Sequence, residues 1–429
     1  MKEGKVLKVG AIGCGGIFNF AHLPAWVDTE DAQLIALYDI DHKHLEQTKQ
    51  RYLALLKKRI KETESQVPNE NETEISLKER ADFYKNKLEN ITIYSDVHEL
   101  IKDVDVIDVC TPVKYHAPYA IMGLEHNVHA MTEKPMARTW WEANKLVKAV
   151  EKSEAFYQLN DDNIFLPRYQ LMKNIIEGGM IGDVQSCWIA RGSHGPEWNP
   201  WFWNPQISGG GCLMDYGTHA VTSLWYLIGF DKEPTEVKSI RISTRHKHRL
   251  IENRLTKVSV DDDAHFKVMF RYPTNNSWIT MIIEATWSWP ELGEESSSVS
   301  GFIRIQGSNG ELTGYRDKEG ADWIKISGIE HKDKLMRVPE TVPEIDSIRG
   351  EIRSFLSCVR QNKKPVLNER VGLGVMQVLG SAYLSEVRDR KTITLEEFRR
   401  FNHELSSKYK SDEELENAVV DFLMKPYRR

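Results

Sequence analysis

The first 160 residues alternate between short apolar runs and stretches with helical spacing. The apolar runs predict strands over residues 6–12, 33–38, 104–110, 128–132 and 156–159. Helical patterns separate them, for example over residues 17–26, 116–126 and 140–153. Strands that alternate with helices are typical of a parallel sheet covered on both faces. The pattern therefore predicts an α/β domain over residues 1–160, built on a doubly wound parallel sheet.

The hydrophobic pattern changes after residue 160. The predicted strands become longer, alternate between apolar and polar positions, and follow one another with few helices between them; they span residues 184–191, 237–243, 265–271, 277–287 and 302–306. Such alternation indicates an antiparallel or mixed sheet with one covered face. Helical patterns return over 345–361 and 371–388. We therefore expect a second, α+β domain over residues 161–395.

Two charged segments lie outside these patterns. Residues 57–90 are rich in Lys, Glu and Asn and keep one apolar helical stripe, which predicts a charged helical hairpin inserted into the first domain. A solvated excursion with one packed stripe is the favoured interpretation, and a regulatory or docking role is the alternative. Residues 396–429 predict a similar charged, helical C-terminal tail.

Composition narrows the class of protein. A chain of 429 residues exceeds the roughly 250–300 residues that one core supports, so at least two domains are expected. A net charge of −6 without a basic stripe argues against nucleic acid as a partner. The sequence contains no apolar run of about 18 residues, so no membrane span is predicted, and we expect a cytoplasmic protein. The five cysteines are odd in number and widely spaced, so neither a disulfide framework nor a metal site is expected.

A glycine-rich turn follows the first predicted strand. Gly13, Gly15 and Gly16 allow the backbone to turn tightly and approach a pyrophosphate at the start of the next helix, although Phe18 stands where a third small residue is usual. Asp39 ends the second predicted strand, where a carboxylate can accept hydrogen bonds from an adenosine ribose. Because this carboxylate would repel a 2′-phosphate, the turn predicts NAD rather than NADP.

Candidate chemistry lies at two further motifs. Lys134, in Glu133-Lys134-Pro135, follows a predicted parallel strand, where open α/β sheets bind ligands. Asp215 and His219, in the block over residues 209–219, are four residues apart and can share one helix face. A carboxylate so placed could orient the imidazole for proton transfer. The alternatives are a surface lysine, and a helix start in which Asp215 satisfies backbone donors while His219 is packed.

Together these motifs resemble the Gfo/Idh/MocA oxidoreductases, the group of glucose–fructose oxidoreductase and inositol dehydrogenase. The resemblance covers roughly residues 5–390 and implies a Rossmann domain followed by a domain with a large open, mostly antiparallel sheet that often forms oligomer contacts. It places Lys134, Asp215 and His219 on the family's catalytic positions. The implied cofactor-binding residues are Gly13, Gly15, Gly16, Ile17, Asp39, Thr111, Pro112, His116, Glu133 and Lys134. The chain departs from the family pattern at Phe18, at the insertion, at the tail, and at Asp161-Asp162-Asn163, where an arginine-containing segment is common.

An aromatic loop over residues 192–204 separates the two chemical motifs. His194, Trp198, Trp201 and Trp203 could form walls and polar contacts for a sugar ring. The equally weighted alternative is that these rings pack the loop against the sheet or fill a subunit contact.

The sequence leads to one preferred function and two alternatives. The preferred function is NAD-dependent hydride transfer to or from a secondary ring alcohol of a sugar, inositol or related polyol. In it His219 takes the hydroxyl proton, Asp215 orients the imidazole and Lys134 stabilises the oxyanion. The alternatives are an NAD-recycling glycosidase that oxidises its sugar transiently and a non-catalytic dinucleotide-binding protein. A homo-oligomer, dimer or tetramer, formed through the C-terminal sheet is also expected.

Overall fold

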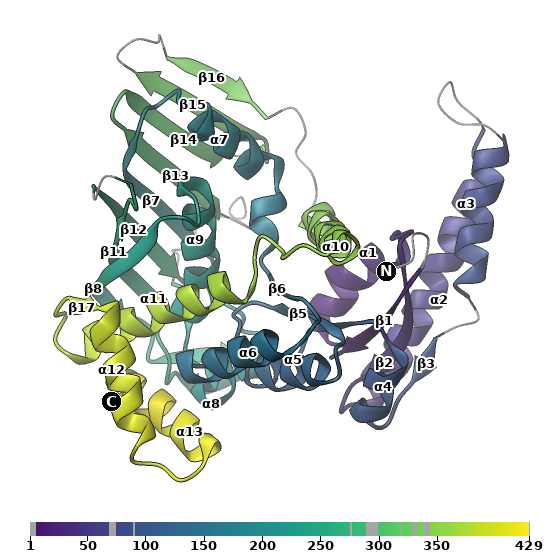
Figure 1. Cartoon of the computed structure of the whole chain (residues 1–429), viewed down its shortest axis with the longest axis horizontal. Coiled ribbons are helices and arrows are strands. Elements are labelled where there is room, and N and C mark those ends of the chain that lie inside the picture. The colour runs from purple at the N-terminus through teal and green to yellow at the C-terminus, as the bar shows by residue number, and fades with distance from the viewer. Residues whose placement is uncertain are drawn as a thin grey trace.

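A computed structural model describes residues 6–67, 74–88, 91–274, 277–288, 299–317, 319–328, 333–338 and 344–428. Its N-terminal part is a six-stranded parallel sheet in the order β3-β2-β1-β4-β5-β6 (Figure 1). The strands are β1 (Leu7–Ile12), β2 (Ala32–Tyr38), β3 (Thr92–Ile93), β4 (Val106–Val109), β5 (His129–Glu133) and β6 (Tyr157–Asn160). The order reverses between β1 and β4, so the predicted doubly wound sheet is confirmed.

Short helices connect these strands. They are η1 (Phe18–His22, a π-helical turn), α1 (Leu23–Val27), α4 (Val97–Asp103), the 3₁₀ turn η2 (Val113–Tyr115), α5 (His116–Glu125) and α6 (Trp140–Lys152). Strands β4 and β6 are buried at every position, as expected for a sheet covered on both faces. The sheet therefore offers ligands only the carboxyl ends of its strands.

The inserted segment forms two helices that project from the first domain (Figure 1). They are α2 (His42–Glu64), which begins well before the predicted insertion, and α3 (Glu74–Asn86); residues 68–73 and 89–90 of the segment lie outside the described part. Two interactions fix its root. Arg59 forms an ion pair with Asp28, with Nε 2.8 Å from Oδ1, and Lys87 Nζ donates to the carbonyl oxygens of Trp26, Val27 and Thr29 at 3.1, 3.1 and 2.6 Å.

The C-terminal part is built on a nine-stranded sheet in the order β16-β15-β14-β13-β7-β12-β11-β8-β17. The strands are β7 (Val184–Gly192), β8 (Glu233–Ser243), β11 (Asp263–Arg271), β12 (Trp278–Thr286), β13 (Val299–Gly307), β14 (Gly310–Arg316), β15 (Asp322–Gly328), β16 (Lys334–Arg337) and β17 (Ile393–Thr394). Strands β9 (His248–Ile251) and β10 (Arg254–Lys257) form a separate hairpin. Within the large sheet β7 and β12 are parallel and the other paired neighbours are antiparallel, which confirms a mostly antiparallel sheet.

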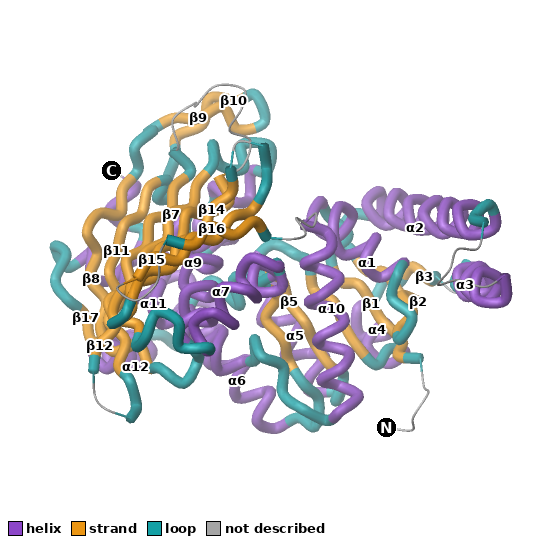
Figure 2. Tube along the Cα trace, turned by 90° about the horizontal axis from the view of Figure 1, so that it is seen from above, coloured by secondary structure: helices purple, strands orange, loops and turns teal. Residues whose placement is uncertain are grey.

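Helices cover the face of this sheet that is turned toward the first domain (Figure 2). The elements leading into and forming this layer are η3 (Asp162–Phe165), α7 (Pro167–Glu177), η4 (Pro200–Trp203), α8 (Pro205–Ser208), α9 (Cys212–Ile228) and α11 (Glu369–Val387). On β11 and β12 the positions on this face are buried and the alternate positions are half-exposed. The sheet therefore presents its second face at the surface.

Two later segments return to the first domain. Helix α10 (Glu344–Gln361) packs against η1 and α1, and its apolar residues Ile348, Ile352 and Phe355 belong to the same core cluster as β1 and β2. The tail forms α12 (Leu395–Ser406), α13 (Asp412–Leu423) and the 3₁₀ turn η5 (Lys425–Arg428). In α13, Glu416 forms ion pairs with Arg138 and Lys145 of the first domain.

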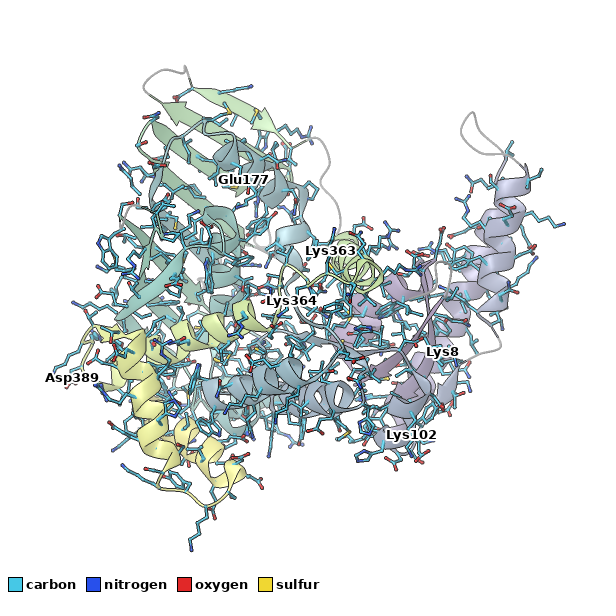
Figure 3. The ribbon with its side chains drawn as sticks, in the orientation of Figure 1. Lys8, Lys102, Glu177, Lys363, Lys364 and Asp389 are labelled. Atoms are coloured by element: carbon cyan, nitrogen blue, oxygen red, sulfur yellow. The ribbon has the colours of Figure 1, made fainter. Side chains whose placement is uncertain are left out.

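Charged side chains at the ends of elements lie at the surface, as Figure 3 shows for Lys102 on α4 and Asp389 after α11, both of which are exposed. Within the described residues, no helix combines the length and apolar character that crossing a lipid bilayer requires.

Candidate active site

A cleft of about 1150 Å³ lies at the carboxyl ends of the parallel strands. Its lining comes from the ends of β1, β2, β4 and β5, from the start of α2, and from the segment 198–215 of the second domain. Ligand pockets for drug-sized molecules span about 300–1,000 Å³. The cleft is therefore large enough for an extended ligand such as a dinucleotide.

The glycine turn forms one wall of this cleft. Gly13 has φ +92°, and a Cβ there would lie 2.8 Å from the backbone of Cys110, so both its conformation and the close approach of β4 require glycine. A Cβ on Gly15 or Gly16 would meet no atom within 4 Å, because both face open space. Phe18, the departure from the usual motif, begins the π-helical turn η1, and its ring is fully buried. This arrangement leaves room for a pyrophosphate beside Gly15 and Gly16.

Asp39 is held at the end of β2 by two backbone donors. The N–H of Cys14 donates to Oδ2 at 2.7 Å and the N–H of Asp41 donates to Oδ1 at 2.8 Å. Asp39 also lines the cleft. A carboxylate fixed there can accept hydrogen bonds from ribose hydroxyls and opposes a 2′-phosphate. The glycine turn and Asp39 together fit NAD.

His116 links the other two cofactor-binding segments predicted from the sequence. Its Nε2 lies 2.7 Å from the carbonyl oxygen of Thr111 and its Nδ1 lies 2.8 Å from that of Pro135. Burial lowers the pKa of this imidazole, with the two carbonyl contacts acting in the opposite direction. Thr111, Pro112, His116, Glu133 and Lys134 all line the cleft, as do Gly13, Gly15, Gly16, Ile17 and Asp39. The structure thus brings every predicted cofactor-binding residue to one cleft.

Lys134 and Asp215 meet across the two domains. Lys134 Nζ lies 2.5 Å from Asp215 Oδ1, and Trp287 Nε1 donates to Oδ2 at 3.0 Å. Burial disfavours both charges, but the pair outweighs it, so the pKa of Lys134 is raised and the pKa of Asp215 is lowered. Each side chain is 15% exposed, and both line the cleft. Lys134 is therefore a charged donor at the cleft wall rather than a base.

His219 takes different partners from the one predicted. Its Nδ1 lies 2.7 Å from Asp161 Oδ1 and 2.7 Å from Asn163 Nδ2, whereas both oxygens of Asp215 are used by Lys134 and Trp287. The prediction that Asp215 orients this imidazole is therefore wrong, because the residue four positions away on the same helix is drawn to the lysine of the other domain. Burial raises the pKa of Asp161, but His219, Arg191 and Lys134 together bring it below its ordinary value.

Asp161 fixes the tautomer of His219. An ionised carboxylate can only accept, so Nδ1 of the imidazole carries the proton and Nε2 is left as an acceptor. His219 is 13% exposed, while Asp161 is fully buried and also accepts from Asn163 Nδ2 at 3.1 Å. Neither His219 nor Asp161 is among the residues that line the cleft, whereas Asp215, four positions before His219 on α9, is. Asp161 lies in the segment 161–163, where the chain departs from the family pattern. That departure was the sequence feature that could have pointed to Asp161 as a functional residue.

Unfilled hydrogen-bonding capacity surrounds this histidine. Oδ2 of Asp161 and Nε and Nη1 of Arg191 are buried without a hydrogen-bond partner. The Arg191 guanidinium lies over the ring of Tyr216, 5.7 Å from its centre, and Asp161 is within its electrostatic range. Buried polar atoms without partners are uncommon in native proteins and call for an explanation such as a ligand.

The aromatic loop divides between the two predicted roles. Trp198, which is 76% exposed, and Trp201 line the cleft, and Trp201 stacks on Phe202 at 3.8 Å between ring centres. Trp203 is buried, packs on Trp287 and donates from Nε1 to the carbonyl oxygen of Pro196 at 3.0 Å. His194 is exposed and lies outside the cleft lining, so neither it nor Trp203 fits the predicted substrate contact.

Two groups of described side chains are close enough to share a metal ion: His22, Asp108 and Cys110, and Asp161, Asp162 and His219. In the first, both ring nitrogens of His22 face carboxylates at 2.8 and 2.9 Å, so both carry protons and neither has a lone pair for a metal. In the second, Nδ1 of His219 is occupied by Asp161. The absence of a metal stays a prediction.

Comparison with known proteins connects this site to a family. Residues 7–161 match the oxidoreductase family with an NAD-binding Rossmann fold, and residues 169–313 match the GFO/IDH/MocA C-terminal domain. The chain is 33% identical over 144 residues to levoglucosan dehydrogenase of Pseudarthrobacter phenanthrenivorans, covering 32% of this chain and 36% of that protein. It is 24% identical over 228 residues to D-glucoside 3-dehydrogenase of Escherichia coli, covering 52% and 54% respectively. The chain thus spans about half or less of the length of these two relatives.

A solved structure extends the likeness to nearly the whole fold. An oxidoreductase domain protein from Kribbella flavida matches 91% of this chain and 99% of its own with a TM-score of 0.70 at 21% identity. Both family matches, in chain order, together span residues 7–313 apart from a short junction, in agreement with the motifs and the two-sheet architecture. The chain therefore belongs to the Gfo/Idh/MocA oxidoreductases, and its N-terminal domain is an NAD-binding Rossmann domain.

Proposed function

We propose that this protein transfers a hydride between NAD and a secondary ring alcohol of a sugar, inositol or related polyol. The observation that carries the proposal is the pair formed by Lys134 and Asp215 in the wall of the NAD cleft. One residue comes from each domain, so a charged donor stands where a cofactor held by the first domain would meet a substrate held by the second. Family membership supports the reaction class.

His219 is the proposed base. Asp161 holds the proton of its imidazole on Nδ1, and Nε2 accepts the proton of the substrate hydroxyl. Lys134 donates a hydrogen bond to the same oxygen and stabilises its developing negative charge. Asp215 keeps the ammonium in place and charged, with Trp287 fixing the second carboxylate oxygen. When bound, NAD supplies the carbon that accepts the hydride.

Hydroxyl groups on the substrate suit the surroundings of His219. Arg191 has buried N–H groups to donate, and Asp161 Oδ2 can accept, so together they complement a neighbouring hydroxyl. Trp198 and Trp201 offer aromatic surface for the apolar face of a ring. Named relatives act on levoglucosan and on D-glucosides, which agrees with this substrate class.

A panel of free sugars, glycosides, inositols and sugar acids, each incubated with NAD and with NADP, tests the proposal. We expect NADH to accumulate with one group of polyols and the NADP reaction to be much weaker, because Asp39 opposes the 2′-phosphate. His219→Gln should lower kcat by about 10²- to 10⁴-fold while NADH binding is kept. Wild-type turnover in that variant would remove His219 from the mechanism, and glycoside cleavage without net NADH would identify the recycling glycosidase.

Assembly and location are further parts of the proposal. The half-exposed face of the nine-stranded sheet supports a homo-oligomer, and the expected compartment is the cytoplasm. Sedimentation of the purified protein tests the first.

A further inference from the structure

His22 lies where three segments of the cofactor site meet. It ends η1, the turn that follows the glycine motif, and its side chain is 0% exposed. Nδ1 lies 2.8 Å from Oδ2 of Asp108, near the end of β4, and Nε2 lies 2.9 Å from Oε1 of Glu133, at the end of β5. Trp26 Nε1 also donates to Asp108 Oδ2, at 2.7 Å. One imidazole therefore bridges the carboxyl ends of two strands from a third segment.

The two partners define the charge of this imidazole. Carboxylates accept hydrogen bonds and do not donate when ionised, so each ring nitrogen of His22 must carry a proton. Burial alone lowers the pKa of His22, but Asp108 reverses the effect and raises the pKa well above its ordinary value. His22 is thus a buried cation shared by two carboxylates.

Glu133 connects the buried His22 to the cleft. It lines the cleft, and its side chain is 13% exposed although His22 and Asp108 are fully buried. His22 holds Oε1, and no hydrogen bond joins Oε2 to another residue in the described part of the chain. A carboxylate oxygen fixed at the wall of an NAD cleft is an acceptor for hydroxyl or amide donors of the cofactor. Glu133 also precedes Lys134, so its position constrains the proposed chemical group.

We propose that His22 is a positioning residue for NAD: its imidazolium holds the Glu133 carboxylate at the cleft wall and so sets the affinity for the cofactor. Asp108 is the buried counter-charge that keeps the imidazole oriented toward Glu133. The proposal depends on NAD binding by the Rossmann domain and is independent of the identity of the substrate and of the role of His219.

A cycle of substitutions with NADH as the probe tests this role. Gln in place of His22 can reach one carboxylate but carries no charge, so His22→Gln should weaken NADH binding by about 10- to 100-fold, measured by fluorescence titration. Glu133→Gln should weaken it to a similar degree. In the double variant the His22 substitution should add little, because the two residues act as one unit.

His129→Gln provides a matched control. His129 begins β5, the strand that Glu133 ends, and its Nδ1 accepts from the backbone N–H of Phe156 at 2.9 Å. This variant should bind NADH as the wild type does. With a working substrate, His22→Gln should raise KM for NAD more than it lowers kcat. A merely structural role would lower the melting temperature and the fraction of binding sites but leave the affinity of the folded protein intact.

Unchanged NADH affinity in folded His22→Gln, or full additivity with Glu133→Gln, would overturn the proposal. If His22→Gln does not fold, ¹⁵N NMR of histidine-labelled wild type replaces it. We expect one histidine to keep both ring nitrogens protonated well above the pH at which an ordinary histidine, with a pKa of about 6.5, loses its second proton, and its resonances to move when NADH is added. The resonances of His22 are assigned as those that shift in the Asp108→Asn variant. A His22 that titrates normally, or that ignores NADH, contradicts the inference.

Discussion

Two lysines in different regions of the first domain, Lys134 at the cleft wall and the buried Lys87, hold their protons differently. In the cleft, Lys134 Nζ faces the carboxylate of Asp215. At the root of the helical hairpin, Lys87 is 3% exposed and its Nζ donates to three backbone carbonyls at the end of α1. Burial lowers both pKa values, but Asp215 raises that of Lys134 above its ordinary value, whereas the pKa of Lys87 falls to about 7. The formal charge of the acceptor, more than the number of hydrogen bonds, decides whether a buried ammonium stays charged.

The opposite pKa shifts of Lys134 and Lys87 agree with the role that we propose for each region. A donor that is to stabilise an oxyanion must be charged throughout the working pH range, and the Lys134–Asp215 pair ensures this. Lys87 joins the hairpin to the C-terminal end of α1, where the ammonium form can donate to all three carbonyls and the neutral amine, which has two N–H groups, to two of them. We therefore propose that the reaction depends on Lys134 and that Lys87 contributes to local stability.

The largest expected effect comes from removing the cleft lysine. Lys134→Met should lower kcat by about 10³-fold, because a charged donor to the reacting oxygen is lost. NADH affinity should change by only a few fold. Steady-state kinetics on the substrate found in the panel and NADH titration measure both. Near-normal turnover would mean that Lys134, like Lys87, is structural.

A smaller effect is expected at the hairpin. At about pH 9, Lys87→Met should lower the free energy of unfolding by about 1–3 kcal/mol, because buried carbonyl oxygens of Trp26, Val27 and Thr29 lose their donor. Urea unfolding measures this, and kcat of the folded protein should match the wild type. A kcat loss comparable to that of Lys134→Met would break the division between the two regions.

The smallest expected effect is a dependence on pH of the difference in unfolding free energy between the wild type and Lys87→Met. Lys87 has a folded pKa of about 7, below the unfolded value of about 10.4, so the unfolded state binds the extra proton between these values and stability rises with pH. The difference in free energy of unfolding between wild type and Lys87→Met should therefore decrease from pH 9 toward pH 7, by at most about 1.4 kcal/mol per pH unit. For Lys134 the folded pKa is raised, so its contribution is complete below about pH 10.4 and is lost only above it. A flat gap for Lys87 would contradict the comparison.

Local patterns in the sequence predicted five of the six Rossmann strands, all but the two-residue β3, together with the glycine turn and Asp39, because each depends on a few neighbouring positions. The remaining cofactor-binding residues were implied by the family resemblance. Gly13, Asp39 and Lys134 lie at strand ends, and the rule that parallel strands end at one edge is enough to bring them together. The meeting of Lys134 and Asp215 at one cleft was also predicted, through the family resemblance.

The partners of the chemical groups could not be predicted in the same way. Asp161 is 58 positions from His219, and Trp287 is 72 positions from Asp215. No periodicity relates residues from different elements, and only the packing of α9 against the domain junction selects these pairs. Asp215 was assigned to His219 because spacing along one helix was visible, whereas a competing lysine from another domain was not.

Helix α10 returns to the first domain and completes its core. The boundary at residue 160 therefore marks the change from one sheet to the other, but the core of the first domain is not built from residues 1–160 alone. Ile348, Ile352 and Phe355 complete the core beside η1 and α1, the elements that carry the glycine turn and His22. A Rossmann half excised at that boundary would leave this apolar surface open to water and its dinucleotide wall unsupported. We therefore expect cofactor affinity to depend also on α10, which lies far along the chain from the glycine turn.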